Sequence, residues 1–274
     1  MTDVLPTQRR IAAELQVPAT FDAAEEIERR VVFLADRLVD TGLATLVLGI
    51  SGGVDSTTAG RLCQLAAQRA REAGHRATFV AMRLPYGVQA DERHAQAALE
   101  FIRPDQVLTV DVRPAADAAL DALVAAGLTF RDAAQRDFVL GNIKARQRMI
   151  AQYAVAGATA GLVVGTDHAA EAVTGFFTKH GDGAADVVPL TGLTKRRVRA
   201  LAATLGAPAE LVGKAPTADL ESLAPGKLDE DALGLAYEEI DDYLEGRPVP
   251  AEVEEKLVAR YRATDHKRRL PIAP

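Results

Sequence analysis

The sequence predicts an α/β fold with a doubly wound parallel sheet flanked by helices, and with C-terminal helices packed on it. Helical and strand patterns alternate along most of the chain. The segment Thr45–Ile50 is continuously apolar, as expected for a strand that is buried on both faces. A glycine-rich turn follows this strand and leads into a helix. Strand, tight turn and helix in this order are typical of a parallel sheet.

The elements follow in order from the start of the chain. Asp22 and Glu25 predict a capping box for a first helix, which ends at Gly42. After the apolar strand a helix is predicted to reach about Ala73. Further strands are expected at 77–84, 106–112 and 161–165, and a short edge strand near 186–189. Helices are expected between them at 91–102, 114–126 and about 132–156.

The pattern becomes helical after Pro189. Thr194 caps a helix that Gly206 closes, residues 213–227 form a loop, and helices follow at 229–244 and 251–263. No Ser/Gly linker interrupts the chain. We therefore expect one domain over residues 1–274, with an N-terminal helical arm (1–43), an α/β core (44–190) and a C-terminal helical region (191–274).

Composition excludes several classes of protein. The chain has 274 residues, of which 48% are hydrophobic and 26% charged, which excludes a disordered chain. No apolar run reaches about 18 residues, and the N-terminus lacks the apolar stretch of a secretory signal, so we expect no membrane contact. The single cysteine, Cys63, excludes a disulfide framework and favours the cytoplasm. A net charge of −6 argues against nucleic-acid binding.

The strongest functional pattern is the loop Gly49–Ser56, with the sequence Gly-Ile-Ser-Gly-Gly-Val-Asp-Ser. Adjacent glycines let backbone N–H groups approach an anion, and the start of the next helix directs further N–H groups there. Ser51 and Ser56 add hydroxyl donors. Asp55 would repel a bare phosphate but would suit Mg²⁺ bound to phosphate oxygens. The alternative interpretation is an ordinary glycine-rich turn between a strand and a helix.

A second acidic cluster follows the strand at 161–165. Thr166 could reach a nucleotide, and Glu171 could supply a second carboxylate to a metal on Asp55, because parallel strands end at the same edge of a sheet. His168 has no second histidine at helical spacing, so a structural or hydrogen-bonding role is favoured for it. The alternative is that Thr166 or Asp167 simply caps a helix.

Charged residues in three other segments are candidates for binding. Lys179, Asp182 and Asp186 lie in the loop around Phe176 and Phe177, although these two aromatic side chains could equally fill the core.

Lys195 lies in the first turn of a helix, where a cation is unfavourable unless an anion binds; a solvated basic turn is the alternative. Arg146, on a half-apolar helix, suits an anionic group or a partner subunit, and the basic tail with His266 and Lys267 suits a phosphate. On these residues alone, ordinary surface charge is the favoured explanation for the helix with Arg146, and a solvated end is the alternative for the basic tail.

Together these residues give the chain a resemblance to the ammonia-dependent NAD synthetases of the ATP pyrophosphatase superfamily, whose fold is adenine nucleotide alpha hydrolase-like. The resemblance covers almost the whole chain. The stretches that carry it are LVLGISGGVDSTTAGRLCQ, RLPYGVQADE, GNIKARQRMIAQY, VVGTDHAAEAVTGFFTKHGDG, PLTGLTKRRVR, KAPTADL, YEEIDDYLEG and HKRRLP.

The resemblance implies a carbon–nitrogen ligase that catalyses the final step of NAD biosynthesis. ATP would adenylate deamido-NAD with release of pyrophosphate, and ammonia would then displace AMP. It also implies a homodimer, and loops at 86–91 and 213–228 that become ordered on substrate binding. The alternatives are another ATP pyrophosphatase, such as a tRNA-modifying or GMP-forming enzyme, and a non-catalytic nucleotide-binding module.

The resemblance also implies roles for individual residues, with Lys195 and Asp182 as the catalytic candidates. Asp182 would orient or deprotonate ammonium, and Mg²⁺ would be held by Asp55 and Glu171. The residues implied for ATP are Gly49, Ile50, Ser51, Gly52, Gly53, Val54, Asp55, Ser56, Thr166, Lys195 and Thr217. Those implied for deamido-NAD are Arg146, Lys179, Asp186, His266 and Lys267.

Overall fold

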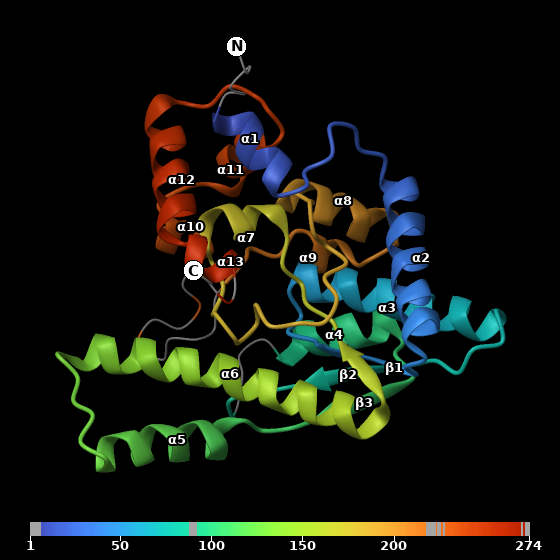
Figure 1. The fold of residues 1–274 in the computed structure, drawn as a ribbon, viewed down its shortest axis with the longest axis horizontal. Helices are drawn as coiled ribbons and strands as arrows, with labels where there is room; N and C mark the ends of the chain where they lie inside the picture. Colours follow the sequence, from blue (N-terminus) through green and yellow to red (C-terminus); the bar gives the residue numbers. More distant parts are fainter. Residues whose placement is uncertain are drawn as a thin grey trace.

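A sheet of parallel strands lies at the centre of the computed structural model, which describes residues 7–87, 92–217, 223, 226, 228–269 and 271 (Figure 1). The strand order is β3–β2–β1–β4. The strands are β1 (Thr45–Gly49), β2 (Thr78–Arg83), β3 (Gln106–Thr109) and β4 (Gly161–Val163). In the register of the sheet, Thr45 lies opposite both Thr78 and Gly161. The predicted edge strand near 186–189 is a single parallel bridge between Val164 and Val187.

The helices lie between and after these strands. They are α1 (Thr7–Glu14), α2 (Ala23–Thr41), α3 (Val54–Glu72), α4 (Glu92–Ile102), α5 (Arg113–Ala125), α6 (Ala133–Thr159), α7 (Ala169–Thr174), α8 (Lys195–Thr204), α9 (Ala209–Val212), α10 (Asp229–Leu233), α11 (Tyr237–Leu244), α12 (Ala251–Ala263) and α13 (Asp265–Arg268).

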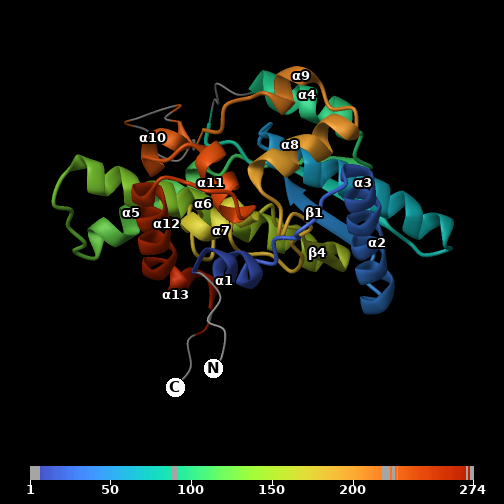
Figure 2. The ribbon, with the colours of Figure 1, turned by 90° about the horizontal axis from the view of Figure 1, so that it is seen from above.

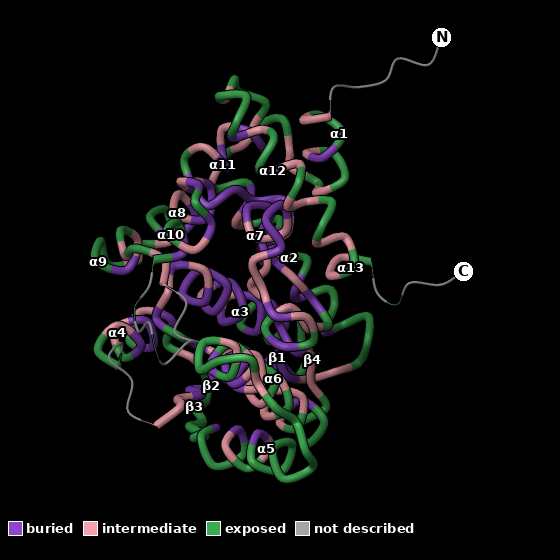
Figure 3. Tube along the Cα trace, turned by 90° about the vertical axis from the view of Figure 1, so that its left-hand side faces the viewer, coloured by how far each residue is buried: buried purple, intermediate pink, exposed green. Residues whose placement is uncertain are grey.

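Helices cover both faces of the sheet, as the uninterrupted apolar strand predicts (Figures 1 and 2). Leu46 and Leu48 of β1 point into one apolar cluster with α2, α3, α4 and α8. Val47 points the other way, into a cluster with β2 and α6. Figure 3 shows buried segments along β1, β2 and α3 and also along α7, whereas β3 at the edge of the sheet is exposed. The predicted doubly wound parallel sheet is therefore confirmed.

Local capping rules locate the helix starts correctly. The carboxylate of Asp22 accepts the N–H of Glu25 at 2.9 Å, and the hydroxyl of Thr194 accepts the N–H of Arg197 at 3.3 Å. The prediction of one helix at 229–244 is wrong, because the chain breaks at Gly234. Its φ of 63° lies in the left-handed region that glycine adopts readily, and this conformation ends α10 before α11 begins.

The C-terminal helices divide between two places. α8 and α9 pack beside α3, on the sheet, whereas α11 and α12 form a separate apolar cluster with α1 and α7 (Figure 1). Ile11, Val173, Tyr243 and Leu257 are among the buried members of this second cluster. The N-terminal segment is divided in the same way, since α1 joins the second cluster while α2 joins the first. Within the described ranges, no helix is both long and apolar enough to cross a bilayer.

We expect Leu62→Ala to lower the free energy of unfolding by about 2–5 kcal/mol, because Leu62 on α3 is 0% exposed and its loss leaves a cavity. Gln68→Ala, at an exposed position of the same helix, should change it by less than about 0.5 kcal/mol. Urea denaturation measures both. Equal midpoints for the two variants would contradict the assignment of α3 to the core.

Candidate active site

The carboxyl ends of β1 and β4 open into a cavity of about 510 Å³. β1 lies between β2 and β4, so the connection after β1 leads to one side of it and the strand on its other side comes later in the chain. Doubly wound sheets bind ligands at the point where the strand order reverses in this way. Most of the predicted site residues line this cavity: Gly49, Ile50, Ser51, Gly53, Val54, Asp55, Ser56, Thr166, Glu171, Asp182, Lys195, Thr217 and Lys267. The structure therefore brings the ATP, metal and catalytic candidates together.

The loop between β1 and α3 has the geometry of an anion cradle. Gly53 occupies the cap position of α3 and supplies no side-chain acceptor to the first turn. The hydroxyls of Ser51 and Ser56 lie 3.1 Å apart, and that of Ser56 donates to the carbonyl of Gly53 at 3.2 Å. These contacts hold the hydroxyls and the helix N-terminus at the edge of the cavity, an arrangement that suits a phosphate group.

Gly52 has a supporting role in this loop and does not line the cavity. Its φ is 83°, and a Cβ at this position would lie 2.6 Å from the backbone nitrogen of Ala95 in α4. Only glycine therefore allows the loop to rest directly on α4.

A buried ion pair joins α3 to α8 inside the cavity. The ammonium group of Lys195 lies 2.7 Å from Oδ2 of Asp55, and Lys195 is only 1% exposed. Burial by itself would raise the pKa of Asp55, but the charge of Lys195 and the contact with His168 outweigh it and keep that pKa below its usual range. Burial would likewise lower the pKa of Lys195, and the carboxylates of Asp55 and Glu171 outweigh it and raise that pKa. Both groups are therefore charged.

The anion predicted at the start of α8 is supplied by the chain itself. The carboxylate of Asp241 on α11 accepts the backbone N–H groups of Lys195 at 2.9 Å and Arg196 at 2.6 Å. The guanidinium of Arg196 also pairs with Asp242 and Glu245. These acidic side chains offset the positive charge of the first turn of α8. The basic turn alone is therefore no evidence for a bound phosphate. The side chain of Lys195, which points to Asp55, remains a candidate for contact with a phosphate.

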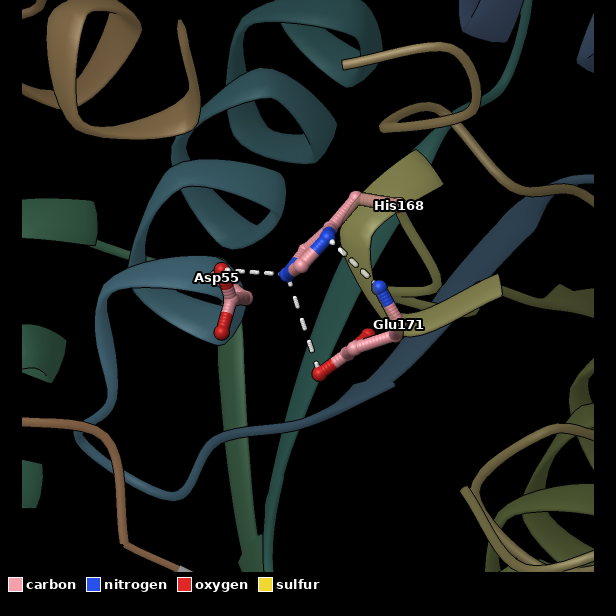
Figure 4. Close-up of side chains that lie close together, drawn as sticks. All are labelled: Asp55, His168 and Glu171. Atoms are coloured by element: carbon pink, nitrogen blue, oxygen red, sulfur yellow. Dashed lines mark hydrogen bonds and ion pairs between the residues drawn. The ribbon is translucent and has the colours of Figure 1, made fainter. Parts of the chain in front are cut away.

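Asp55, His168 and Glu171 converge from two elements (Figure 4). Nε2 of His168 lies 3.4 Å from Asp55 Oδ1 and 3.7 Å from Glu171 Oε1. Nδ1 of His168 accepts the N–H of Glu171 at 3.4 Å and caps α7, so the prediction that Thr166 or Asp167 caps this helix is wrong. Because burial lowers the pKa of His168, the ring is neutral, and the proton lies on Nε2. The predicted hydrogen-bonding role of His168 is therefore fulfilled through Nδ1, whereas Nε2 lies near the two carboxylates without a hydrogen bond among the described residues.

The residues present fit a magnesium ion. The carboxylates of Asp55 and Glu171 each offer one oxygen, and these two atoms lie within 4.8 Å of each other. Burial and the charge of Asp55 raise the pKa of Glu171 well above its usual range, because two adjacent carboxylates repel. Oδ1 of Asp55 is buried without a hydrogen-bond partner among the described residues. A divalent cation would remove both penalties, and carboxylate oxygens are the ligands that Mg²⁺ prefers.

The residues predicted to bind deamido-NAD are not brought to one place. Arg146, Lys179 and His266 form an exposed group beside the cavity: the guanidinium of Arg146 donates to the carbonyl of Lys179, whose Nζ lies 3.4 Å from Nδ1 of His266. Lys267 lines the cavity. Asp186 lies apart from both, because its carboxylate accepts the N–H of Val163 at 2.7 Å at the edge of the sheet.

The two predicted mobile loops are described only in part. Residues 88–91 of the first loop, and residues 218–222, 224, 225 and 227 of the second, lie outside the described residues. Thr217 lies at the wall of the cavity and forms an antiparallel bridge with Leu228.

Sequence reasoning missed two members of the site. Asp229 begins α10 and lines the cavity, and its Oδ2 accepts the hydroxyl hydrogen of Tyr237 at 3.2 Å. The ring of Tyr237 in turn lies 5.0 Å from Nζ of Lys195. Asp229 belongs to none of the motifs named above, and Tyr237 begins the stretch YEEIDDYLEG but had no predicted role; the packing of the C-terminal helices brings Asp229 to the cavity and Tyr237 next to Lys195.

Comparisons with known proteins agree with this arrangement. The family model described as NAD synthase matches residues 26–271. This chain belongs to the NAD synthase family. A protein of Streptomyces coelicolor named NH(3)-dependent NAD(+) synthetase is 76% identical over 267 residues, which are 97% of each chain. A Burkholderia mallei protein of the same name is 64% identical over 98% of this chain and 95% of its own length.

Solved structures of the NAD synthase family have the same fold. The crystal structure of NAD+ synthetase from Burkholderia pseudomallei is 63% identical, covers 96% of both chains and superposes with a TM-score of 0.84. The structure of NMN synthetase from Francisella tularensis is 33% identical, with a TM-score of 0.80 over 93% of this chain and 99% of that one.

For this member of the NAD synthase family, we expect Lys195→Met to lower the free energy of unfolding by about 3–5 kcal/mol, because it leaves the carboxylate of Asp55 buried without its cation. The double variant Asp55→Asn/Lys195→Met should recover most of this loss, since no unpaired charge remains. Urea denaturation without Mg²⁺ measures the three proteins. Equal destabilisation of the single and the double variant would show that the pair does not stabilise the fold.

We also expect Asp55→Asn and Glu171→Gln each to raise, by about tenfold or more, the Mg²⁺ concentration that gives half-maximal thermal stabilisation. The double variant should need little more Mg²⁺ than the single variant that needs the higher concentration, because the two carboxylates act on one ion. Asp121→Asn, on an exposed part of α5, is the matched control and should leave the Mg²⁺ dependence unchanged. Glu171 would not be a metal ligand if the fold-increase in the double variant equalled the product of the two single increases. The same conclusion would follow if Glu171→Gln left the Mg²⁺ dependence unchanged.

Proposed function

We propose that this protein is an ammonia-dependent NAD synthetase, a carbon–nitrogen ligase that converts deamido-NAD to NAD at the expense of ATP. The observation that carries the proposal is the 76% identity, over 97% of both chains, with the Streptomyces coelicolor enzyme of that name. The cavity supports it, since a phosphate-binding loop, two converging carboxylates and a buried lysine share one space.

In the first half-reaction, a carboxylate oxygen of deamido-NAD attacks the α-phosphorus of ATP, and pyrophosphate leaves. The backbone N–H groups at the start of α3 and the hydroxyls of Ser51 and Ser56 bind the phosphates. The ammonium of Lys195 stabilises the negative charge that develops on the α-phosphate oxygens. Asp55 and Glu171 would hold Mg²⁺, which supplies further positive charge next to the triphosphate when it is bound.

In the second half-reaction, ammonia attacks the carbonyl carbon of the adenylate, and AMP leaves as the amide forms. The nitrogen must lose protons, so a base is needed beside the reacting carbon. Asp182 is our candidate: it lines the cavity, and its carboxylate accepts the N–H of Thr178 at 2.9 Å. Burial raises the pKa of Asp182, which makes the carboxylate a better proton acceptor.

We assign deamido-NAD to the wall of the cavity next to Lys267 and to the exposed group of Arg146, Lys179 and His266. The three basic side chains suit the phosphates of a dinucleotide. Asp186 retains the structural role described above, at the edge of the sheet. The cytoplasm remains the proposed location, in keeping with the single cysteine, Cys63, which is buried and free.

The decisive experiment supplies the purified protein with ATP, Mg²⁺, ammonium and deamido-NAD. We expect NAD, AMP and pyrophosphate in equal amounts, and no pyrophosphate when deamido-NAD is omitted. Nicotinate mononucleotide is tested as a competing substrate, because a structurally similar protein is named an NMN synthetase. An equal rate with glutamine as the sole nitrogen donor, in ammonia-free buffer, would contradict dependence on ammonia.

We further propose a homodimer, built through an exposed apolar patch on β3, α5 and α6. The exposed apolar residues on or just beyond these elements are Val107, Leu108, Val110, Leu123, Val124, Leu128 and Ile150. In Figure 1, α5 lies beside α6, which also carries Arg146. Exposed apolar patches of this kind are typical of subunit interfaces.

Light scattering should give twice the chain mass of 29.1 kDa at micromolar concentration. Ile150→Asp, at a side chain 51% exposed in the patch, should shift the protein to the monomer, because the new carboxylate would be buried without a partner. Phe33→Asp, at a residue 39% exposed on α2, is the matched control and should leave the dimer intact. A monomeric wild-type protein would refute this part of the proposal.

A further inference from the structure

A second cavity, of about 520 Å³, lies on the far side of the segment that follows β4. Its walls come from the end of α1, the start of α7, the turn at residues 191–192 and the segment from α12 to α13. Figures 1 and 2 both place α1, α7 and α13 side by side. Glu14 and Arg269, both exposed, lie at its outer rim, and Asp167 lies at its inner end with His168.

Only a thin partition separates this cavity from the active site. Phe177 and Lys267 line both cavities. Nζ of Lys267 donates to the carbonyls of Gly175 at 2.8 Å and Phe177 at 2.7 Å, so these residues form one wall.

Each of the two cavities is lined by an acidic residue whose pKa is raised. Asp167 lines the second cavity, and Asp182 lines the first. The two interact, because burial and then the charge of Asp182 raise the pKa of Asp167 to about 7. Within the described ranges, Asp167 has no hydrogen bond or ion pair, so its carboxyl group is available to a ligand.

The basic residues of the second cavity are already engaged. The guanidinium of Arg268 donates to the carbonyls of Ala172 and Tyr261, and Arg269 lies 3.4 Å from Asp265. Lys267 donates to the two carbonyls named above. Among the described residues the carboxyl of Asp167 has no hydrogen bond or ion pair, which suits it to a small cation that donates hydrogen bonds.

The proposed reaction needs such an entrance. When ATP and deamido-NAD fill the first cavity, the third substrate must reach the reacting carbon from another side. The adenylate must also stay away from bulk water, so the path for the nitrogen donor should not run through the opening that ATP and deamido-NAD use. In neutral water the nitrogen donor is mostly ammonium, a small cation with four N–H groups.

We infer that the second cavity admits ammonium, that Asp167 receives it, and that it passes the Phe177–Lys267 partition to reach Asp182. This inference rests on the proposed function, and it adds a substrate path and a binding residue to it. Asp167 binds ammonium through its carboxylate, and no covalent bond forms or breaks before ammonium reaches the active site.

The test compares two variants of the full-length enzyme. Asp167→Asn removes the negative charge without changing the size of the side chain, and Thr191→Phe fills the second cavity away from the metal-binding carboxylates. Both should raise the ammonium concentration at half-maximal rate by about tenfold or more, because a charge-assisted hydrogen bond or the path itself is lost. Asp121→Asn and Thr191→Val are the matched controls and should resemble the wild type.

A second readout separates this inference from the proposed function. Exchange of pyrophosphate into ATP, measured with deamido-NAD and without ammonium, reports only the first half-reaction and should be unchanged in both variants. If the wild type shows no such exchange, the proposed function fails. If exchange is normal and the ammonium dependence of Asp167→Asn, or of folded Thr191→Phe, equals that of the wild type, the inference is overturned. Thr191→Leu replaces Thr191→Phe if the larger side chain prevents folding.

Discussion

The geometry of the active site depends on the buried ion pair between Asp55 and Lys195. Asp55 lies in the first turn of α3 and Lys195 opens α8, so their contact at 2.7 Å fixes the starts of two helices against each other. Asp241 of α11 fixes the same helix start from the other side, through the backbone N–H groups of Lys195 and Arg196. A buried charge is stable only with its partner, so this arrangement resists any displacement of α8.

The cavity lies between two apolar clusters, and each contributes one of the two carboxylates that we propose to hold Mg²⁺. Asp55 belongs to α3, which packs on the sheet in the first cluster. Glu171 belongs to α7, whose apolar residues Ala169, Ala170 and Val173 lie in the second cluster. The distance between the two carboxylates is therefore set by how the clusters pack together. Nε2 of His168 lies 3.4 Å from Asp55 and 3.7 Å from Glu171.

Several acidic residues around the cavity have raised pKa values, so they hold a proton more readily than an exposed carboxylate does. Burial raises the pKa values of Asp167, Glu171 and Asp182, and the charges of neighbouring acids add to this effect for Asp167 and Glu171. Only Asp55 is held firmly as a carboxylate, by Lys195 and His168. The site can therefore accept a cation or a proton at several points without a large change in overall structure. This property suits a reaction that combines a metal, a triphosphate and ammonium.

The sequence by itself determined those features that depend on neighbours within one or two turns. The caps at Asp22 and Thr194, the alternation of strands and helices, and the loop Gly49–Ser56 were all predictable from local rules. The convergence of Asp55 and Glu171 was also predictable, because parallel strands end at one edge of a sheet.

Only the tertiary structure decided which distant groups meet. Asp55 and Lys195 are 140 residues apart, and Asp241 is a further 46 residues beyond Lys195. No local pattern links these three side chains, since their contact results from the packing of α3, α8 and α11. The same holds for Asp229, which reaches the cavity although it belongs to no motif. Sequence patterns reflect contacts between residues of one helix or strand. Charge pairing and pKa shifts depend instead on burial between helices and strands, and only the folded chain creates that burial.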